Sequence, residues 1–392
     1  MYVFPKKDQC SGCTACMHSC PTDAITMECD VEGFKYPIID DQRCIDCGIC
    51  RRICPFNNAY DVSSNFKVPL VYAVKNKDEQ CRLTSSSGGI FPALAQSVID
   101  KNGVVYGVAF DENFNVKHMK GETEEEILKF KGSKYVQSDL GNIFGDIQGE
   151  LSSGRYVLFS GTPCQVAGLK AFLNKAHHRL ILVDLVCAGA PSPRIWSEYL
   201  KLLQETTKSK LTEINLRDKS GGWRDSRTNA YFENKDHLYR DQLLDSFRSI
   251  FSGHAALRPS CYRCIFANFR RPGDITIGDF WGIEKCKPHF DDDKGVSLVL
   301  LNTEQGQRIF EEIGDQLLYE VSSVDDAMQR NLQRPTPPSP KREQFWLEFE
   351  SKGYKYVARK YTTYGIRNRF KQHVLKPILV KLRIFTLLRR SG

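Results

Sequence analysis

The feature that most constrains this chain is a cysteine pattern that occurs twice near its N-terminus. Each copy reads C-x2-C-x2-C-x3-C-P, and every cysteine of the second copy follows its counterpart by 34 residues. Three cysteines at this spacing wrap one corner of a 4Fe–4S cubane, and the fourth, held away by three residues and a proline, reaches the neighbouring cluster. The first cluster is expected to use Cys10, Cys13, Cys16 and Cys54, and the second Cys44, Cys47, Cys50 and Cys20.

Zinc is the main alternative for so many thiols. Zinc sites usually pair two C-x2-C knuckles, however, rather than a compact triple with a crossed fourth ligand. Gly12 and Gly48 suit chain turns that pass close to inorganic sulfide, where a side chain would intrude. Residues 1–60 resemble bacterial two-cluster ferredoxins, although PFNNAY follows the second run where PTDAI follows the first. Such a segment passes single electrons, so we expect the chemistry to lie elsewhere in the chain.

Composition and charge narrow the function classes. The chain has 392 residues, 15 cysteines, no long uncharged apolar run and no apolar signal core, so we expect a cytoplasmic protein without a transmembrane helix. Disulfides are rare in the cytosol, which favours metal or redox roles for the cysteines. Twelve Lys and Arg residues and no Asp or Glu lie in 351–392, whereas the preceding residues carry 43 basic and 47 acidic side chains. The positive charge is therefore not spread over a folded face, and no nucleic-acid binding is expected.

Apolar runs alternate with helical patterns after the cysteine-rich segment, which favours an α/β core. The runs that we interpret as strands are VYAV (71–74), GVVYGVAF (103–110), RYVLF (155–159), LILVDLV (180–186), ITIGDF (275–280) and VSLVLL (296–301). Residues 61–69 are interpreted as a linker, and PTPPSP (335–340) breaks regular structure. The expected architecture is a small α+β ferredoxin domain over 1–62, an α/β central domain with a mixed sheet over 63–334, and a Pro-rich linker with a basic helical tail over 335–392.

Four later cysteines form a second candidate group. Cys164 follows a strand, with Thr162 as a helix cap and Pro163 at the first helical position. Cys187 ends the next strand, so if both strands are parallel the two thiols share one sheet edge, where ligand sites open. The remaining pair is the C-x2-C knuckle Cys261 and Cys264. Four thiols suffice for a third cubane; the alternative is a zinc knuckle plus two buried thiols. The cysteines without an assigned partner are Cys29, Cys81 and Cys286.

Longer segments around these cysteines resemble a known family. The segments SGTPCQVAGLKAFL, LVCAGAPSP, RDKSGGW, SCYRCIFANFRRPGDITIGDFWGI and GVSLVLLNTEQG are similar to the beta subunits of coenzyme F-420 hydrogenases and dehydrogenases. The resemblance covers about residues 1–330 and implies an FAD and one 4Fe–4S cluster in the central domain. Similar proteins with this ferredoxin front end occur in bacterial surface-polysaccharide gene sets. Ala188 stands where the family often has His after the second cysteine, which puts any carried-over substrate in doubt.

Two segments are candidates for the flavin site. TSSSGGIF (84–91) is a Ser/Gly loop before a helical pattern, where backbone and hydroxyl groups can approach a phosphate or a flavin carbonyl. KGSKYVQSDLG (131–141) offers lysines for a pyrophosphate and a tyrosine for ring stacking. The alternatives are a helix cap with glycines and a solvated charged loop, and no GxGxxG predicts a nicotinamide site. The residues expected to bind the cofactor are Ser86, Ser87, Gly88, Gly89, Lys131, Gly132, Ser133, Lys134 and Tyr135.

Acidic and basic groups near a flavin suit proton transfer coupled to hydride transfer. RDKSGGW (217–223) and GDFWG (278–282) supply such groups; the alternative is a turn with a salt bridge and core tryptophans. The expected catalytic residues are Asp218, Lys219 and Asp279, beside Trp223 and Trp281. The resulting hypothesis is an iron–sulfur flavoprotein oxidoreductase with an unidentified small-molecule substrate, for which coenzyme F-420 is a candidate, and a redox partner or ferredoxin-like donor. The alternatives are a non-catalytic electron-relay subunit and, more remotely, a scaffold with structural metals.

The basic tail carries one more pattern. An apolar stripe recurs every three or four residues at Leu375, Ile378, Leu379, Leu382, Phe385 and Leu388. One interpretation is a terminal helix packed on the body. The other is a basic amphipathic helix at an anionic membrane surface, which would place the protein peripherally at the inner face of the membrane, or at an acidic partner.

Overall fold

The structure is a computed structural model that describes residues 3–4 and 6–365. Its contacts divide the chain into two compact units. The first unit comprises Met1–Arg194, Leu216–Ser226 and Leu257–Pro337. The second unit comprises Ile195–Asn215, Arg227–Ala256 and the described residues from 338 onward.

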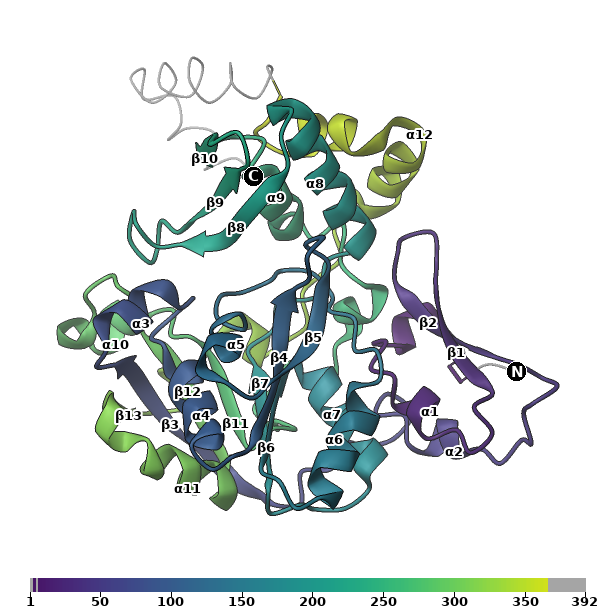
Figure 1. Cartoon of the computed structure of the whole chain (residues 1–392), viewed down its shortest axis with the longest axis vertical. Helices are drawn as coiled ribbons and strands as arrows, with labels where there is room; N and C mark the ends of the chain where they lie inside the picture. Colours follow the sequence, from purple (N-terminus) through teal and green to yellow (C-terminus); the bar gives the residue numbers. More distant parts are fainter. Residues whose placement is uncertain (1–2, 5, 366–392) are drawn as a thin grey trace, which may run out of the picture. The chain divides into compact units, whose positions relative to one another are not determined.

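The first unit is built on an eight-stranded mixed sheet with the order β13-β3-β12-β11-β7-β6-β4-β5 (Figure 1). Strands β11, β7, β6 and β4 run parallel to one another, and antiparallel pairs complete the sheet. The strands are β3 Asn65–Asn76, β4 Val104–Phe110, β5 Val116–Gly121, β6 Val157–Gly161, β7 Leu180–Leu185, β11 Ile275–Asp279, β12 Ser297–Thr303 and β13 Leu317–Ser322. The α-helices of the sheet region are α3 Glu79–Thr84, α4 Ile90–Ile99, α5 Glu124–Leu128, α6 Ile143–Ser152, α7 Pro163–Leu173, α10 Ile283–Cys286 and α11 Glu304–Glu312. The short 3-10 helices are η2 Pro259–Arg263, η3 Pro288–Phe290, η4 Gly314–Gln316 and η5 Arg330–Leu332.

Side chains alternate between the two faces of this sheet, because successive residues of a strand point to opposite sides. Val105 and Leu158 belong to a core that α4 and α11 complete. Their neighbours Tyr106 and Phe159 belong to another core, which α6 and α7 complete. Both faces are therefore apolar, which explains why the central strands are nearly continuous hydrophobic runs. Because β6 and β7 are parallel, the segments that follow them leave from the same edge of the sheet.

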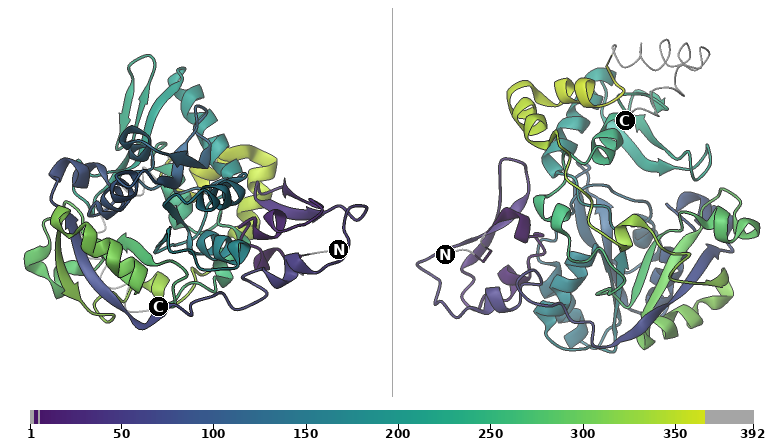
Figure 2. Two further views of the ribbon diagram at one scale, coloured as in Figure 1. Left: turned by 60° about the horizontal axis from the view of Figure 1, so that its bottom comes forward. Right: turned by 180° about the vertical axis from the view of Figure 1, so that it is seen from behind.

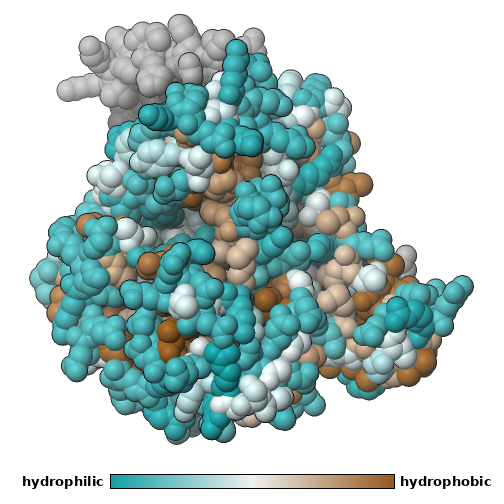
Figure 3. Space-filling view, viewed as in Figure 1, coloured by the Kyte–Doolittle hydropathy of each residue, from teal (hydrophilic) through white to brown (hydrophobic). Residues whose placement is uncertain are grey.

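The cysteine-rich N-terminal segment belongs to the first unit. It contains a two-stranded antiparallel sheet, with a 3-10 helix and two short helices. These elements are η1 Lys7–Gln9, α1 Ala15–His18, β1 Ile25–Cys29, β2 Lys35–Ile39 and α2 Ile49–Arg52. Helix α1 packs on α7, and Figure 2 shows the purple N-terminal segment beside the teal part of the unit. Ala15 is buried in the core of α6 and α7, and His18 contacts the rings of Phe144 and Phe172. The segment is thus anchored by apolar packing, while Figure 3 shows apolar side chains that it leaves on the surface.

The second unit has a three-stranded sheet with the order β10-β9-β8. Its elements are most of α8 Pro193–Thr207, the part of β8 Leu211–Asp218 before Leu216, β9 Arg227–Phe232, β10 His237–Tyr239, α9 Ser246–Ser252 and α12 Arg342–Tyr361. An aromatic group holds the helices together: Tyr199 contacts Trp196, Phe247 and Tyr354 at ring-centroid distances of 5.3, 5.4 and 5.8 Å. Helix α12 is kinked at Gly353, where φ is +74.

The structure confirms the expected α/β architecture and overlaps every predicted strand. The linker predicted at 61–69 is wrong in its second half, because β3 begins at Asn65 and continues into the buried strand. By contacts, residues 1–62 and most of 63–334 share one compact unit, and parts of 195–256 group with the described residues after 338. The domain boundaries at 62 and 334 stay a prediction. The stripe at 375–388 lies outside the described residues. Among the residues that are described, no helix is long and apolar enough to cross a membrane.

Candidate functional site

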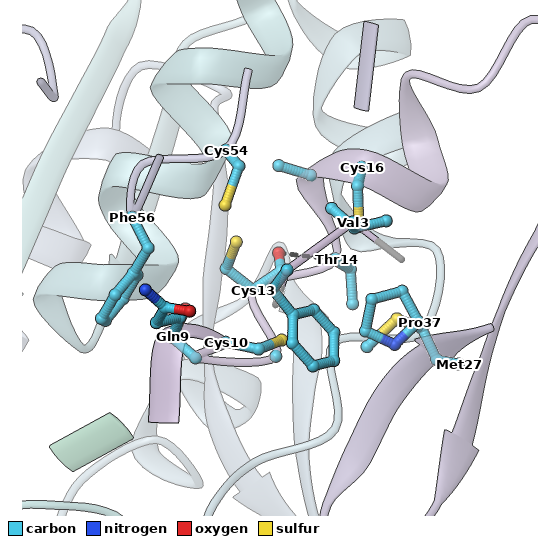
Figure 4. A pocket seen from close by; sticks show the side chains of 14 residues that line it. Val3, Gln9, Cys10, Cys13, Thr14, Cys16, Met27, Pro37, Cys54 and Phe56 are labelled. Atoms are coloured by element: carbon cyan, nitrogen blue, oxygen red, sulfur yellow. Dashed lines mark hydrogen bonds between the residues drawn. The ribbon is translucent and has the colours of Figure 1, made fainter. Parts of the chain in front are cut away.

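Four cysteines that were predicted to hold one cluster line a single pocket. Cys10, Cys13 and Cys16 come from the first run and Cys54 from the second, and Figure 4 shows the Cys13 and Cys54 sulfurs facing one another. We call these four residues the first set. Burial and the neighbouring thiols raise the pKa of Cys13 to about 12, and burial also raises the pKa of Cys54. Neutral thiols at this site must lose protons to hold iron.

The second set consists of Cys44, Cys47, Cys50 and Cys20. Burial raises the pKa of Cys50, and the Cys47 and Cys44 thiols reinforce the shift, so these three side chains lie near one another. Cys20 interacts with Thr22 and accepts a hydrogen bond from the Ala24 amide at 3.3 Å. Burial opposes these hydrogen bonds but does not outweigh them, and the pKa of Cys20 is lowered. Cys47 is exposed, whereas no member of the first set is.

The third set consists of Cys164, Cys187, Cys261 and Cys264. Burial, together with thiols of the same set, raises the pKa of Cys187 to about 12 and that of Cys264 to about 11. The backbone amides of Gly189 and Ala190 donate to the sulfurs of Cys187 and Cys261 at 3.4 and 3.3 Å. The parallel strands β6 and β7 and the helix η2 therefore bring together thiols from three separate segments of the chain, and backbone amides donate to two of them.

A buried ion pair ties the elements of the third set to one another. Arg271 and Asp184 are 1% and 0% exposed, and their closest contact is 2.7 Å. Arg271 also donates to the carbonyl oxygens of Leu185 and Phe266 at 2.8 and 2.6 Å. It thereby links the end of β7, before Cys187, to the chain that follows Cys264. The sequence carries no local signal for this arginine, because its partner lies 87 residues away.

The first and third sets are neighbours. Burial raises the pKa of Cys164, and Thr162, Arg258 and Ser11 oppose the rise, so Ser11 of the first cysteine run lies near the third set. The Thr162 hydroxyl lies 3.2 Å from the Cys164 sulfur. A Cβ atom at Gly168 in α7 would lie 2.8 Å from the Cys13 Cβ atom. Gly168 lies about one helical turn after Cys164. Because it has no side chain, Cys13 of the first cysteine run can pack directly against α7 at this point. This glycine is the one signal in the sequence for close contact between the two sets, and the cysteine patterns do not point to it.

The thiols are not arranged as a single-ion site. Over the described residues, no three His, Cys, Asp or Glu side chains converge closely enough to hold one metal ion. Gly12 and Gly48 both have positive φ, +70 and +68, as chain turns beside the cysteines require. The space next to Gly12, which was expected to face inorganic sulfide, is filled by Arg258 Nη1 and the Gln137 amide.

The Ser/Gly loop packs chiefly against the protein itself. A Cβ atom at Gly88 would lie 2.1 Å from the Val74 carbonyl oxygen and 2.5 Å from the Ser297 amide nitrogen. Gly89 has φ +83 and caps α4. The Ser86 hydroxyl accepts a hydrogen bond from the Ser133 amide at 2.8 Å, so the two predicted flavin segments do meet. Gly88 is therefore required by strands β3 and β12, whether or not a cofactor approaches the loop.

The lysines of the second segment bond to protein groups. Lys134 donates to the carbonyl oxygens of Lys129 and Lys131, both at 2.7 Å, and burial lowers its pKa to about 7. Lys131 donates to the Thr84 hydroxyl at 2.6 Å, and Gly132 has φ +80 with open space where a Cβ atom would lie. Both lysines are thus engaged by the protein, and Gly132 alone of these three residues faces open space.

Arg217, which sequence analysis did not select, organises the predicted catalytic residues. It donates to both carboxylate oxygens of Asp279 at 2.9 and 3.2 Å and to the Tyr135 hydroxyl at 3.1 Å. Asp279 also accepts a hydrogen bond from the Trp223 indole at 2.7 Å. Trp281 stacks on Trp223 at 4.6 Å and leaves 42% of its surface exposed. A planar ligand could stack on this exposed tryptophan beside the arginine.

The other two predicted catalytic residues hold backbone groups. Lys219 donates to the carbonyl oxygens of Arg82, Ser87 and Lys294 at 2.7 to 2.8 Å. Burial and the nearby arginines lower its pKa to about 7. Asp218 accepts from the Ser220 amide at 2.9 Å and so closes a turn. The carbonyl oxygen of Ala188, the residue found in place of the family His, accepts a hydrogen bond from Thr336 at 2.7 Å.

Two regions of the chain match known protein families. Residues 154–327 match the family described as the C-terminal part of the beta subunit of coenzyme F-420 hydrogenase/dehydrogenase. This region is therefore similar to that family. Residues 9–58 match a 4Fe–4S dicluster domain, so the F-420 hydrogenase-type region follows a segment for iron–sulfur clusters. The resemblance expected from the cysteine-bearing segments is confirmed by these two matches.

Individual relatives are distant. The chain is 30% identical over 122 residues to an uncharacterized ferredoxin of Methanocaldococcus jannaschii. That alignment covers 31% of this chain and 65% of the relative, so the chain spans just under two thirds of the relative's length. A chain of the F-420-reducing NiFe hydrogenase complex from Methanosarcina barkeri is similar at a TM-score of 0.45 and 19% identity, covering 79% of this chain and 97% of that chain.

Proposed function

We propose that this protein is an iron–sulfur flavoprotein oxidoreductase in which the three cysteine sets and the Ser/Gly loop serve one path for electrons. The observation that carries the proposal is the contact between the first and third sets. A 4Fe–4S cluster supplies one-electron transfer, and a flavin interconverts one- and two-electron transfer. Ser11, Cys13 and Gly168 bring the two sets together within one compact unit.

The order of the sets follows from their exposure. Cys47 of the second set is exposed, so this set suits an external donor such as a ferredoxin-like partner. The first set lies between the second set and the third, because Cys54 comes from the second run and Cys13 contacts α7. In this order electrons would enter at the second set, pass to the first set and reach the third set at the edge of the central sheet.

The FAD and substrate sites belong to the same proposal. Ser86, Ser133, Lys131 and Gly132 would hold the cofactor, and Trp281 with Arg217 would hold a planar substrate. The family of residues 154–327 makes coenzyme F-420 the first substrate to test. Lys219, whose pKa is lowered to about 7, is suited to proton transfer. To take part, it would have to exchange one of its carbonyl partners for a ligand.

A second function, an electron-relay subunit without its own substrate, is favoured by one observation. Asp279 is fully engaged by Arg217 and Trp223, and Lys219 by three carbonyl oxygens. In an electron-relay subunit, Asp279 and Lys219 would hold the loops around Trp223 in place and would take no part in a reaction. Anaerobic purification with iron, sulfide and flavin analysis, followed by a screen of reductants, separates the two functions. A flavin that small molecules bleach supports the oxidoreductase; a flavin reduced only with a partner protein supports the relay.

Replacing Gly89 with valine is expected to abolish stoichiometric flavin binding while the N-terminal iron remains. A β-branched residue cannot adopt φ +83 without strain, which costs about 1–2 kcal/mol and displaces the loop. Flavin is measured by absorbance after release from the protein. Gly154→Val is the matched control, because Gly154 has the same φ of +83 but its Cβ atom would meet only the flexible end of Arg179. Full flavin content in Gly89→Val would mean that the loop is only a helix cap.

A further inference from the structure

Arg258 is one of the largest side chains that this protein buries, with 1% of its surface exposed. It lies three residues before Cys261, and its guanidinium reaches the N-terminal segment. Nε donates to the Cys10 carbonyl oxygen at 2.7 Å, and Nη2 donates to Cys10 Sγ at 3.6 Å and to the Lys35 carbonyl oxygen at 2.9 Å. Nη1 donates to the Gln137 amide oxygen at 3.1 Å. One side chain therefore joins the first set to the chain of the third set.

The first cysteine run is shaped to receive this guanidinium. A Cβ atom at Gly12 would lie 2.9 Å from Arg258 Nη1 and 3.0 Å from the amide nitrogen of Gln137. On another side the guanidinium lies over the Tyr36 ring, 4.2 Å from its centroid. The arginine thus fills the space that the glycine leaves beside Cys10.

No carboxylate lies within ion-pair distance of Arg258 among residues 3–4 and 6–365, although the other deeply buried arginines have such partners. Those pairs are Arg271 with Asp184, Arg217 with Asp279 and Arg82 with Asp292. A buried guanidinium that meets only neutral acceptors is strongly disfavoured, because desolvation of its charge is not offset by an opposite charge. The burial of Arg258 therefore implies that a negatively charged group other than a carboxylate lies beside its guanidinium.

The thiolates of the neighbouring cysteine sets can supply that negative charge. Arg258 bonds to Cys10 Sγ of the first set. Burial raises the pKa of Cys164 in the third set, and Thr162 and Arg258 oppose that rise. An iron–sulfur core held by four thiolates carries net negative charge, and its reduction adds one more. A fixed positive charge beside it favours the reduced form, since net charge and hydrogen bonds to the sulfurs set such potentials.

We propose that Arg258 is the buried counter-charge of the first set: it raises the reduction potential of the centre held there and fixes the N-terminal segment beside the third set. The inference rests on the proposed function for the presence of that centre. Arg258 acts through Cys10 and touches no reacting atom, so its role is a positioning one.

The second cysteine run provides a matched control. Gly48 takes the place of Gly12, and a Cβ atom there would lie 3.3 Å from Arg52 Nη1. Arg52 donates to the Cys47 carbonyl oxygen at 2.9 Å, just as Arg258 donates to Cys10, but Arg52 is exposed. Water and salt screen an exposed charge, so its removal changes the local potential much less.

The test is an EPR-monitored redox titration of the anaerobically purified full chain and of Arg258→Met, Arg258→Lys and Arg52→Met. At the wild-type midpoint, Arg258→Met is expected to raise the ratio of oxidised to reduced centre at least tenfold, which is about 59 mV for one electron. Arg258→Lys keeps the charge and is expected to change that ratio less than tenfold. Arg52→Met is expected to do the same, because its charge is screened.

A smaller than tenfold change in Arg258→Met with full iron content would overturn the proposal. If that variant fails to fold or loses its iron, Arg258→Lys decides. A ratio within tenfold of the wild type then supports the counter-charge, and a larger change shows that hydrogen-bond geometry matters instead and overturns it. Cys164→Ser separates the cluster proposed at the third set from the role proposed for Arg258. Full iron content in Cys164→Ser would contradict a cluster at the third set. A tenfold change of the ratio in Arg258→Met would still support the role of Arg258 at the first set. A wild-type chain without 4Fe–4S signals overturns both.

Discussion

Replacing Cys164 with serine is expected to remove about a third of the iron that the chain binds. Three 4Fe–4S clusters hold about twelve iron atoms, and loss of one thiolate of the third set should release about four of them. The clusters proposed for the first and second sets use other cysteines, so their EPR signals should persist. Iron and sulfide analysis of the anaerobically purified variant measures the loss directly.

The matched control is Cys286→Ser. Cys286 belongs to none of the three sets, and its sulfur contacts the carbonyl oxygens of Gly282 and Ile283 at 3.8 Å. The same chemical change there should leave the iron content unaltered. If Cys164→Ser also keeps all its iron, the four thiols of the third set are a buried group without a cluster, and electrons must leave the first set by another route.

The sequence was most informative where one local rule decides a structure. Continuous apolar runs, separated by helical patterns, predicted the strands β4, β6 and β7. These runs are continuous because both faces of the sheet are buried and leave few polar positions. Thr162 and Pro163 likewise predicted the start of α7, since a capping residue followed by proline is a local signal. The crossed spacing of the cysteine runs grouped Cys54 with the first set, which the pocket brings together.

Contacts between distant segments could not be read from the sequence. Ala15 of the N-terminal segment is buried in the core of α6 and α7, and no local pattern around it indicates this contact. Three arginines that organise the sites, at 217, 258 and 271, carry no local pattern, because their partners lie tens to hundreds of residues away. Gly88 looked like a ligand-binding glycine, but the close approach that it permits is to β3 and β12.

Replacing Arg271 with methionine is expected to lower the free energy of unfolding of the first unit by about 3–5 kcal/mol, because it leaves the Asp184 carboxylate buried without its partner. Methionine retains much of the side-chain volume, so the loss reflects charge and hydrogen bonds rather than a cavity. Urea unfolding followed by circular dichroism measures the change, with the iron content checked in parallel. Because Arg271 links the strand before Cys187 to the chain after Cys264, iron of the third set should be lost at lower urea concentrations than in the wild type.

Arg155→Met is the control for this substitution. Arg155 belongs to the same unit and pairs with Glu122 and Glu150 at 2.6 and 3.0 Å, but 31% of its side chain is exposed. Partly exposed ion pairs contribute about 1 kcal/mol or less, so the control should change stability only slightly. The double variant Arg271→Met with Asp184→Leu should recover part of the loss, since it removes the unpaired charge as well as the pair. Equal stability of Arg271→Met and Arg155→Met would show that the buried pair does not hold the third set together.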